Sequence, residues 1–412
     1  MKVLAILAGG RGERLRPFTE TRPKPLMPVL GESLLCRHLK QALASARFDV
    51  VVVLASYMAG EVLREARSCA GDKVVGVDQG GELGTGHAIL RVMEEVGPGD
   101  YTIVYGDLYL DPRYYKLLAS AGSPAILASR AERPWEYGVL EVEDGILRGV
   151  REKPDPESTP SDALVFIGGL RLDYDATIGY LRKLKPSPRG ELEVTDALNS
   201  MARDYEVRVL GAQWPWLDVG RPWDLLRANR LALEEPGFKP KLEGEVHPTA
   251  VVEGPVYIAP GARVRPHSVI EGPAYIGGGA EVGPNAHLRP YTVMLEGSKA
   301  GFSTQVKASL LMEHSKAPHL NYVGDSVVGE HVNLGAGTVT ANLRFDGKTV
   351  KVTVKGVRVD SGLRKLGAFI GGHAKTGINV SIMPGVKIGS YAVIYPGCVV
   401  TRDVAPSETY KC

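Results

Sequence analysis

The hydrophobic positions of the chain follow two different patterns, and the change between them falls near residue 235. In the first part, short runs rich in Val, Ile and Leu alternate with longer segments whose apolar residues recur at helical spacing. The strand-like runs include Val50–Leu54, Tyr101–Tyr105 and Ala125–Ser129, and the helical segments include Leu34–Arg47 and His87–Val96. This alternation predicts an α/β domain over residues 1–235, with a doubly wound sheet and with ligands at the carboxyl ends of its strands.

The second pattern is an aliphatic residue at every sixth position. The unbroken series is Val246, Val252, Ile258, Val264, Ile270, Ile276, Val282, Leu288 and Met294, and the register resumes at Val328, Leu334, Ile370, Ile382, Ile388, Ile394 and Val400. A strict six-residue repeat is typical of a parallel β-helix, in which each aliphatic side chain points into the coil and stacks on its neighbours. We therefore expect a β-helix over residues 242–412, joined to the first domain by a linker at 236–241.

Composition narrows the class of protein further. A chain of 412 residues is long enough for two to three domains. The formal net charge is +2, without a long run of one sign, so we expect neither a nucleic acid nor a membrane as partner. The apolar run at the N-terminus is too short for a signal peptide, and no stretch is long and apolar enough to span a bilayer. We expect a soluble, cytoplasmic protein.

The four cysteines, Cys36, Cys69, Cys398 and Cys412, lack the spacing of a metal site. Isolated thiols in a reducing cell are the simpler interpretation. Asn and Gln are few, however, and Pro and Arg are plentiful, which is typical of thermophiles. A thermophilic origin would also permit a Cys36–Cys69 disulfide.

The chain begins with a strand-like run that leads into a glycine-rich turn. The turn reads Leu7-Ala8-Gly9-Gly10-Arg11-Gly12-Glu13-Arg14-Leu15, and Pro23-Lys24-Pro25-Leu26 follows. Glycines let the backbone N–H groups approach an anion, and Arg14 and Lys24 can supply cations where charge develops. Together the two motifs resemble the signature of the sugar-1-phosphate nucleotidyltransferases. The resemblance implies a Rossmann-like domain in which Arg14 and Lys24 are catalytic. It also implies that nucleotide is bound by Leu7, Ala8, Gly9, Gly10, Gly12 and Arg14.

A second glycine-rich loop, residues 79–88, reads Gln-Gly-Gly-Glu-Leu-Gly-Thr-Gly-His-Ala. The carboxamide of Gln79 has both a donor and an acceptor, which is what reading a pyrimidine edge requires. The run from Leu83 to Ala88 resembles the base-binding loop of uridylyltransferases, which implies nucleotide contacts at Gln79, Gly84 and Thr85. UTP and dTTP both remain open as substrates.

Two carboxylates follow strand-like runs, in Val104-Tyr105-Gly106-Asp107 and in Trp216-Leu217-Asp218. Either aspartate alone could begin a turn, but together they match the two metal positions of the family. With triphosphate oxygens, they would form the oxygen-rich site that suits Mg²⁺. We expect Asp107 and Asp218 to hold the metal and Gly106 to contact the nucleotide.

The sugar contacts of the family have counterparts in Tyr137-Gly138 and Glu152-Lys153. By this resemblance, Glu152 accepts hydrogen bonds from sugar hydroxyls and Lys153 holds the sugar phosphate. The implied reaction is an in-line attack of the sugar phosphate oxygen on the α-phosphorus of the triphosphate, with pyrophosphate leaving.

The β-helix carries polar residues where its repeat is interrupted, between Glu313 and Val327 and in the following loop. One run reads Lys316-Ala317-Pro318-His319-Leu320-Asn321-Tyr322-Val323-Gly324-Asp325, and another reads Asn333-Leu334-Gly335-Ala336-Gly337-Thr338. These two runs resemble the glucosamine-1-phosphate acetyltransferase half of the bifunctional bacterial enzyme, and the repeats resemble hexapeptide acyltransferases. The resemblance implies a left-handed coil, a homotrimer, acetyl-CoA as co-substrate along residues 367–376 and 382–397, and His319 as general base. The implied acceptor site comprises Arg289, Lys307, His319, Tyr322, Asn333, Asn342, Lys348 and Lys351.

The sequence thus predicts a bifunctional enzyme that acetylates an amino-sugar-1-phosphate and transfers UMP or dTMP to a sugar-1-phosphate. Which sugar is preferred, N-acetylglucosamine or glucose, stays open. One alternative is a single-activity pyrophosphorylase, such as a mannose-1-phosphate guanylyltransferase, whose β-helix only oligomerises or binds regulators. A second alternative is a subunit that binds nucleotide without turnover.

Overall fold

A computed structural model of the chain describes residues 1–81 and 83–412, and its contacts group them into two compact units. The first unit comprises residues 1–11, 23–26 and 33–218. The second comprises residues 12–22, 27–32 and 219–412. The N-terminal glycine-rich turn is therefore divided, since the segment Gly12–Arg22 makes its contacts within the second unit. The predicted domain limits, 1–235 and 242–412, stay a prediction.

The first unit is built on a mixed sheet whose strand order begins β5-β4-β1-β6 and continues with β11-β8-β12-β10-β9. The strands are β1 (Lys2–Ala8), β4 (Val50–Ala55), β5 (Val74–Asp78), β6 (Asp100–Tyr105), β8 (Ala125–Arg130), β9 (Gly138–Glu143), β10 (Ile146–Glu152), β11 (Leu164–Asp173) and β12 (Arg208–Gly211). The first four strands pair in parallel, and β11 runs antiparallel to β6. Residues 3–6 of β1 are fully buried because helices cover both faces of the sheet.

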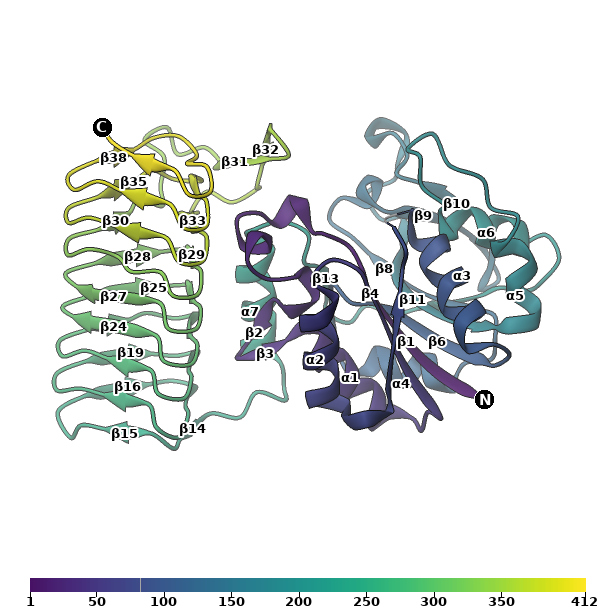
Figure 1. Cartoon of the computed structure of the whole chain (residues 1–412), viewed down its shortest axis with the longest axis horizontal. Coiled ribbons are helices and arrows are strands. Elements are labelled where there is room, and N and C mark those ends of the chain that lie inside the picture. Colours follow the sequence, from purple (N-terminus) through teal and green to yellow (C-terminus); the bar gives the residue numbers. More distant parts are fainter. Residues whose placement is uncertain (82) are drawn as a thin grey trace. The chain divides into compact units, whose positions relative to one another are not determined.

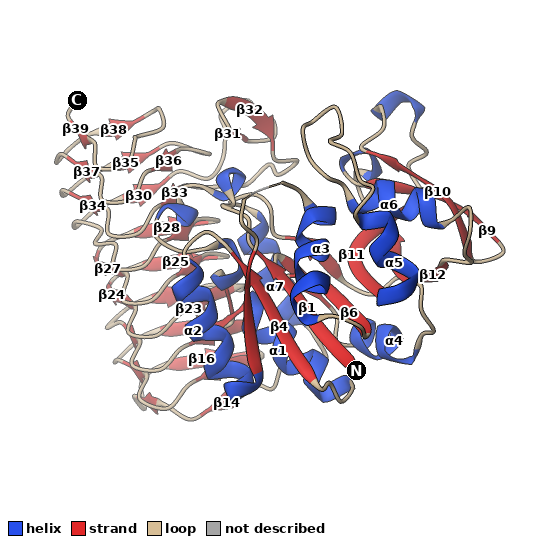
Figure 2. Cartoon of the chain, turned by 45° about the vertical axis from the view of Figure 1, so that its right-hand side comes forward, coloured by secondary structure: helices blue, strands red, loops and turns tan. Residues whose placement is uncertain are grey.

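The helices divide between the two faces of this sheet (Figure 2). One face is covered by α1 (Leu34–Ser45), α2 (Ala59–Ala70) and α4 (Arg113–Ser120), and the other by α3 (Thr85–Val96), α5 (Tyr174–Leu181) and α6 (Val194–Met201). The predicted strands and helices are confirmed to within two residues at each end. A short pair of strands, β7 (Leu108–Leu110) and β13 (Trp216–Asp218), runs antiparallel beside the main sheet.

The second unit is dominated by a parallel β-helix whose coils follow one another in sequence order (Figure 1). Its first side contains β14 (Lys241–Leu242), β17 (Val256–Ile258), β20 (Ala274–Ile276), β23 (Thr292–Met294), β26 (Leu310–Leu311), β29 (Val327–Val328), β33 (Phe369–Ile370) and β36 (Lys387–Ile388). Its second side contains β15 (Glu245–Val246), β18 (Arg263–Val264), β21 (Glu281–Val282), β24 (Lys299–Phe302), β27 (Lys316–His319), β34 (Lys375–Thr376), β37 (Val393–Ile394) and β39 (Thr409–Tyr410). Its third side contains β16 (Val251–Glu253), β19 (Val269–Glu271), β22 (His287–Leu288), β25 (Gln305–Lys307), β28 (Tyr322–Gly324), β30 (Val339–Thr340), β35 (Ser381–Ile382) and β38 (Val399–Val400). The unit also includes β2 (Pro28–Val29) and α7 (Asp224–Glu234), while β3 (Glu32–Ser33) straddles the two units.

The predicted six-residue register is confirmed by the core of this coil. From Ile258 to Val400, each aliphatic residue of the series is buried in it, and Val246 and Val252 pack against its first coils. The predicted interruption after Glu313 is a change in coil length, since the coil continues through β27 and β28. Ile276 pairs with Met294, 18 residues on, whereas Met294 pairs with Leu311, 17 residues on.

An insertion separates Val328 from Ile370, its partner in the next coil. The chain leaves the coil after Asn342 and returns at Leu366, whose N–H donates to the Asn342 carbonyl. Between these points lies a hairpin of β31 (Lys351–Val354) and β32 (Val357–Asp360). Among the described residues, no helix is long and apolar enough to cross a membrane.

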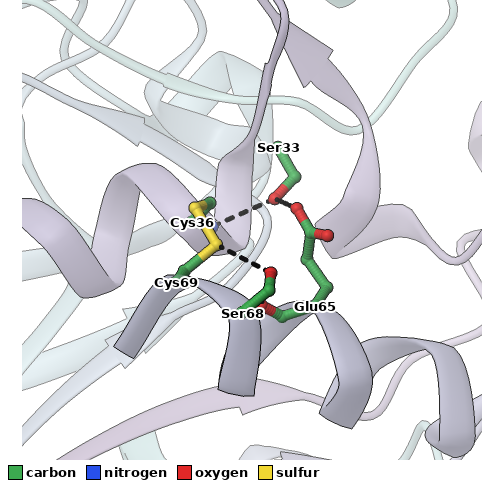
Figure 3. The surroundings of a disulfide bond; sticks show 5 residues. All are labelled: Ser33, Cys36, Glu65, Ser68 and Cys69. Atoms are coloured by element: carbon green, nitrogen blue, oxygen red, sulfur yellow. Dashed lines mark hydrogen bonds between the residues drawn. A yellow bond between two sulfur atoms is a disulfide. The ribbon is translucent and has the colours of Figure 1, made fainter. Parts of the chain in front are cut away.

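The cysteines correct one prediction. All four lie in the described residues and all four are paired, as Cys36–Cys69 and Cys398–Cys412, so the interpretation as isolated thiols is wrong. Cys36 in the first turn of α1 bonds to Cys69 near the end of α2 (Figure 3). Ser33 caps α1 by accepting from the Cys36 N–H at 3.1 Å, and its hydroxyl donates to Glu65 of α2 at 2.7 Å. The two helices are therefore tied by a covalent bond and a hydrogen bond.

The Cys36–Cys69 bond closes a loop of 33 residues, which restricts the unfolded chain. Replacing both cysteines by serine is expected to lower the free energy of unfolding of the first unit by about 2–4 kcal/mol. Chemical denaturation followed by circular dichroism measures this loss. A thiol reductant should destabilise the wild type in the same transition and leave the double variant unchanged there. An unfolding free energy equal to that of the wild type would contradict the assignment.

Candidate functional site

The first unit contains a cleft of about 260 Å³ at the carboxyl ends of β1, β4 and β6, which is where a doubly wound sheet binds ligands. It is lined by Leu7, Gly9, Gly10, Leu54, Gln79, Gly84, Thr85, Ala88, Tyr105, Asp107 and Glu191. The structure therefore brings together both glycine-rich loops and one of the two predicted metal ligands. Glu82 of the second loop lies outside the described residues.

Gln79 is held against the first glycine-rich turn. Its side chain is buried, and its amide group donates to the Gly84 carbonyl at 3.4 Å. A Cβ atom at position 9 would lie 2.1 Å from the Gln79 side-chain oxygen, so no residue larger than glycine fits at position 9 without a shift. The absence of a side chain at Gly9 therefore allows the Gln79 carboxamide to lie in the wall of the cleft.

Tyr105, which the sequence interpretation missed, closes the cleft beside the start of α3. Burial raises the pKa of Tyr105, while a hydrogen bond with Thr85 opposes this effect. Its ring meets Phe166 edge to face at 5.9 Å between centroids. The available signal was its position, because Tyr105 ends β6 and directly precedes Gly106-Asp107. Gly106 and Ala8 lie beside the cleft, and the Gly106 N–H donates to the Leu7 carbonyl at 2.8 Å.

The two predicted metal ligands converge on one cation. The ammonium of Lys24 lies 2.5 Å from an oxygen of Asp107 and 3.4 Å from an oxygen of Asp218. The convergence follows from strand pairing, because β13 places Asp218 opposite Leu108, the neighbour of Asp107. Lys24 is buried, whereas the two carboxylates are about a third and a quarter exposed.

This donor set fits a divalent cation. Carboxylate oxygens are the hard ligands that Mg²⁺ takes in proteins, and partly exposed carboxylates leave room for the waters that it keeps. The Lys24 ammonium already shows that one positive charge can contact both groups. The site can hold Mg²⁺ between Asp107 and Asp218 if Lys24 moves from the carboxylates to a nearby anion.

The four predicted sugar contacts also come together. Gly138 pairs with Glu152 across β9 and β10, and the Lys153 N–H donates to the Tyr137 carbonyl at 3.0 Å. The Tyr137 ring meets Trp216 edge to face at 5.3 Å between centroids. Trp216 and Asp218 lie on the same strand, β13. The predicted sugar contacts are therefore connected to the Asp107–Asp218 pair through the packing of Tyr137 on Trp216.

Arg189 neutralises the carboxylates beside the sugar contacts. Its guanidinium lies 3.2 Å from Glu152 and 2.7 Å from Glu193. Burial raises the pKa of Glu193; Arg189 opposes this rise, and the charges of Glu152 and Glu191 add to it. Burial also raises the pKa of Asp196, with a contribution from Glu152. This region can therefore present both acceptors and a cation to a hydroxylated ligand.

Four predicted nucleotide contacts do not line the cleft: Ala8 and Gly106, which lie beside it, and Gly12 and Arg14. Gly12 and Arg14 belong to the segment Gly12–Arg22 of the second unit. Gly12 has a φ of 65°, and Arg14 follows in a single 3-10 turn, where its side chain is exposed.

In the second unit, three of the predicted acceptor residues meet around Asp325. The Lys307 ammonium lies 2.8 Å from Asp325, and the Asn342 amide donates to Asp325 at 2.5 Å and to the Tyr322 hydroxyl at 3.1 Å. Arg289 lies one coil earlier, level with Lys307, because Leu288 pairs with Val306. Asp325 ends the run that carries the acetyltransferase resemblance, but the sequence interpretation gave it no role in the acceptor site. It lies where the six-residue repeat loses one residue.

The remaining acceptor residues lie elsewhere on the β-helix. His319 ends β27 on the second side, where it is exposed and pairs with Phe302 of the preceding coil. Asn333 is level with Lys316 and Lys375 on the same side. Lys348 and Lys351 belong to the insertion. A single chain therefore gathers Lys307, Tyr322 and Asn342, but its described residues show no contact that joins them to His319.

Comparisons with known proteins agree with this architecture. Residues 4–235 match the nucleotidyl transferase family, and residues 367–402 match the bacterial transferase hexapeptide family, described as six repeats. These repeats and the three parallel sides of the coil confirm the predicted left-handed β-helix. A crystal structure of UDP-glucose pyrophosphorylase complexed with UDP-glucose shares the fold over 57% of this chain and 99% of that one, with a TM-score of 0.50 and 23% sequence identity.

Similar proteins also match over the full length. A bifunctional sugar-1-phosphate nucleotidylyltransferase/acetyltransferase of Sulfurisphaera tokodaii is 44% identical over 98% of this chain and 99% of its own. A protein named bifunctional protein GlmU from Methanocaldococcus jannaschii is 40% identical over 97% of this chain and 95% of its own. A third relative, bifunctional protein GlmU of Methanococcus aeolicus, is 38% identical over 98% of this chain.

The carboxylate pair generates a prediction about metal binding. Because both carboxylates would ligate one ion, Asp107→Asn and Asp218→Asn should each weaken Mn²⁺ binding in the presence of nucleotide by roughly tenfold or more. Electron paramagnetic resonance of free Mn²⁺ during a titration measures the affinity. Asp111→Asn is a matched control, because Asp111 pairs with Arg113 instead. Wild-type affinity in both test variants would contradict a shared ion.

Proposed function

This chain belongs to the nucleotidyl transferase family, and we propose that it is a bifunctional enzyme that works on sugar-1-phosphates. Its first activity acetylates an amino-sugar-1-phosphate, such as glucosamine-1-phosphate, with acetyl-CoA. Its second transfers UMP or dTMP from the triphosphate to a sugar-1-phosphate and releases pyrophosphate. The full-length similarity to a bifunctional nucleotidylyltransferase/acetyltransferase supports both activities. We assign nucleotidyl transfer to residues 1–235 and acetyl transfer to residues 242–412.

One observation carries the nucleotidyltransferase assignment: Lys24, Asp107 and Asp218 converge at the cleft that both glycine-rich loops line. A nucleoside triphosphate bound there would place its phosphates near two metal ligands and a buried ammonium. Pre-arranged charges of this kind are the main source of catalysis in phosphoryl transfer. A subunit that merely bound nucleotide would not require all three groups.

We also assign residues that would contact the nucleotide base and the sugar. Gln79, Gly84 and Thr85 would read the pyrimidine, because the pinned Gln79 carboxamide offers both a donor and an acceptor. Glu152 and Tyr137 would contact the sugar ring, and Lys153 would hold its phosphate. Leu7, Gly9 and Gly10 would lie against the nucleotide, with Ala8 and Gly106 shaping the backbone beside it.

The chemistry needs neither a covalent intermediate nor a strong base, since a phosphate monoester is already an anionic nucleophile. The oxygen of the sugar phosphate forms a bond to the α-phosphorus as the bond to the pyrophosphate oxygen breaks. Lys24, Arg14 and Lys153 would neutralise and align the phosphates. Asp107 and Asp218 would hold Mg²⁺, which would supply positive charge to stabilise the negative charge on the phosphates.

For acetyl transfer, we assign the role of general base to His319. It would take a proton from the sugar amine as the nitrogen attacks the thioester carbonyl of acetyl-CoA; the tetrahedral intermediate then expels the CoA thiolate. Lys307, Tyr322 and Asn342 would hold the sugar phosphate and hydroxyls, with Arg289 in the preceding coil. Asn333, Lys348 and Lys351 would complete the acceptor site. Acetyl-CoA would bind along residues 367–376 and 382–397.

We further propose that the β-helices form a homotrimer and that neighbouring copies complete this site. Exposed apolar residues lie at or within two residues after the ends of strands on the second side of the coil, namely Phe302, Leu320, Ile378 and Tyr395, of which Leu320 is 59% exposed. A row of exposed apolar side chains is typical of a surface that a partner covers. Because His319 lies between Phe302 and Leu320, a partner on this edge would enclose it.

The two active sites should fail independently. Lys24→Ala is expected to lower the rate of pyrophosphate release by roughly a hundredfold or more, because it removes a pre-arranged charge. His319→Ala should lower CoA release by roughly a hundredfold or more, because it removes the base. Each variant should keep the other activity. The assays use UTP or dTTP with a panel of sugar-1-phosphates, and acetyl-CoA with glucosamine-1-phosphate.

These measurements also separate the alternatives. If the wild type releases pyrophosphate but no CoA, the first alternative, a single-activity pyrophosphorylase with an oligomerising β-helix, would be favoured. If the wild type releases no pyrophosphate with any triphosphate, the second alternative, a subunit that binds nucleotide without turnover, would be favoured. Full activity of Lys24→Ala with the best substrate pair would refute the proposed catalytic site.

A further inference from the structure

The N-terminal signature is held by the β-helix. The segment Gly12–Arg22 carries Arg14 and joins the contacts of the second unit. Its two anchors are a buried aromatic contact and a set of polar contacts at one corner of the coil. The Phe18 ring meets the ring of Phe369 in β33 edge to face at 6.4 Å between centroids, and both side chains are buried.

The strongest polar contact joins Arg22 to Glu313. Two guanidinium nitrogens of Arg22 donate to the two carboxylate oxygens of Glu313, at 3.1 and 2.8 Å. This two-bond geometry fixes orientation as well as distance. Burial alone would raise the pKa of Glu313, but the hydrogen bonds and charge of Arg22 hold it below the usual value. The pair is therefore ionised and directional.

Ser390 makes the second polar contact. Its N–H donates to the carboxylate of Glu20 at 2.7 Å, and its hydroxyl donates to the Pro17 carbonyl at 3.3 Å. Ser390 is buried, so these bonds face little competition from water. The segment is thus held at three points along its length: Pro17-Phe18, Glu20 and Arg22.

The corner that carries these anchors is itself stiffened by stacked rings. His314, His331, His373 and Tyr391 occupy the same corner in successive coils, with centroids 5.0, 5.0 and 4.7 Å apart. Glu313 directly precedes His314, and Ser390 directly precedes Tyr391. A ladder of near-parallel rings resists bending of the coil at this corner, so Glu313 and Ser390, which make the polar contacts, are attached to a rigid frame.

We propose that Glu313 and Ser390 are positioning residues for nucleotidyl transfer, although both belong to the β-helix. They hold the segment that carries Arg14. They also hold Arg22, which only Pro23 separates from Lys24. The inference rests on the proposed roles of Arg14 and Lys24. It gives the β-helix a part in the chemistry of the first activity, in addition to acetyl transfer.

The physical reason is pre-organisation. A loop segment with long cationic side chains loses much conformational entropy when it closes on phosphates. Anchors that order the segment beforehand remove part of this cost from the transition state. Loss of the Arg22–Glu313 pair should therefore act on nucleotidyl transfer, while acetyl transfer proceeds as before.

The test is a double-mutant cycle on the full-length protein with Arg22→Gln, Glu313→Gln and both together. We expect each single variant to lower kcat/KM for nucleotidyl transfer by roughly tenfold to a hundredfold, and the double variant to be no worse than either single one. Faster amide hydrogen exchange in residues 12–22 should accompany the loss. The matched control is Arg402→Gln, which breaks the Arg402–Glu408 pair in a later coil.

The acetyltransferase assay reports whether each variant is folded. Unchanged CoA release with impaired pyrophosphate release supports positioning, and partial rescue by the charge swap Arg22→Glu with Glu313→Arg supports it further. Wild-type nucleotidyl kinetics in both single variants would overturn the inference while leaving the proposed function intact. Equal loss of both activities would show that the Arg22–Glu313 pair is needed for folding, and it would also overturn the inference. A wild type without nucleotidyl activity would instead refute the proposed function.

Discussion

The first unit depends on the balance of charge between Lys24 and the carboxylates of Asp107 and Asp218. Two carboxylates so close together repel each other unless a cation lies between them. The sheet forces the proximity, because Asp107 follows a central strand and β13 returns Asp218 beside it. With the Lys24 ammonium between them, the pair is stable without a ligand. We propose that the same two carboxylates hold a divalent ion once a triphosphate offers the ammonium a stronger partner.

In the β-helix, the regular six-residue repeat forms the scaffold. Several of the residues proposed for acetyl transfer lie where that repeat is broken. The aliphatic residues of the six-residue series from Ile258 to Val400 are all buried in the interior, although shorter coils and the insertion interrupt their spacing. Coils shortened by one residue place Lys307 and Asp325 together, and the insertion after Asn342 brings further lysines. The shortened coils and the insertion change the repeat only at the surface, so the stacked aliphatic interior remains continuous.

Patterns that repeat along the chain were predictable from the sequence. The strands and helices of the first unit and the six-residue register both follow from local periodicity, which is why they were confirmed. Features that depend on which residues meet in the folded chain were not. The Cys398–Cys412 bond and the clustering of Gly12–Arg22 with the β-helix involve partners that no local pattern connects. Tyr105 was missed because its only signal was its position at the end of a strand, which a residue that merely packs in the core would share.

The central claim is that one divalent ion replaces Lys24 between the two carboxylates when nucleotide binds. Anomalous diffraction from a crystal grown with Mn²⁺ and a nucleoside triphosphate tests it most directly. We predict one manganese peak within coordination distance of both Asp107 and Asp218, with the Lys24 ammonium moved onto the phosphates. A peak that contacts neither carboxylate, or a Lys24 still paired with both beside bound nucleotide, would contradict it.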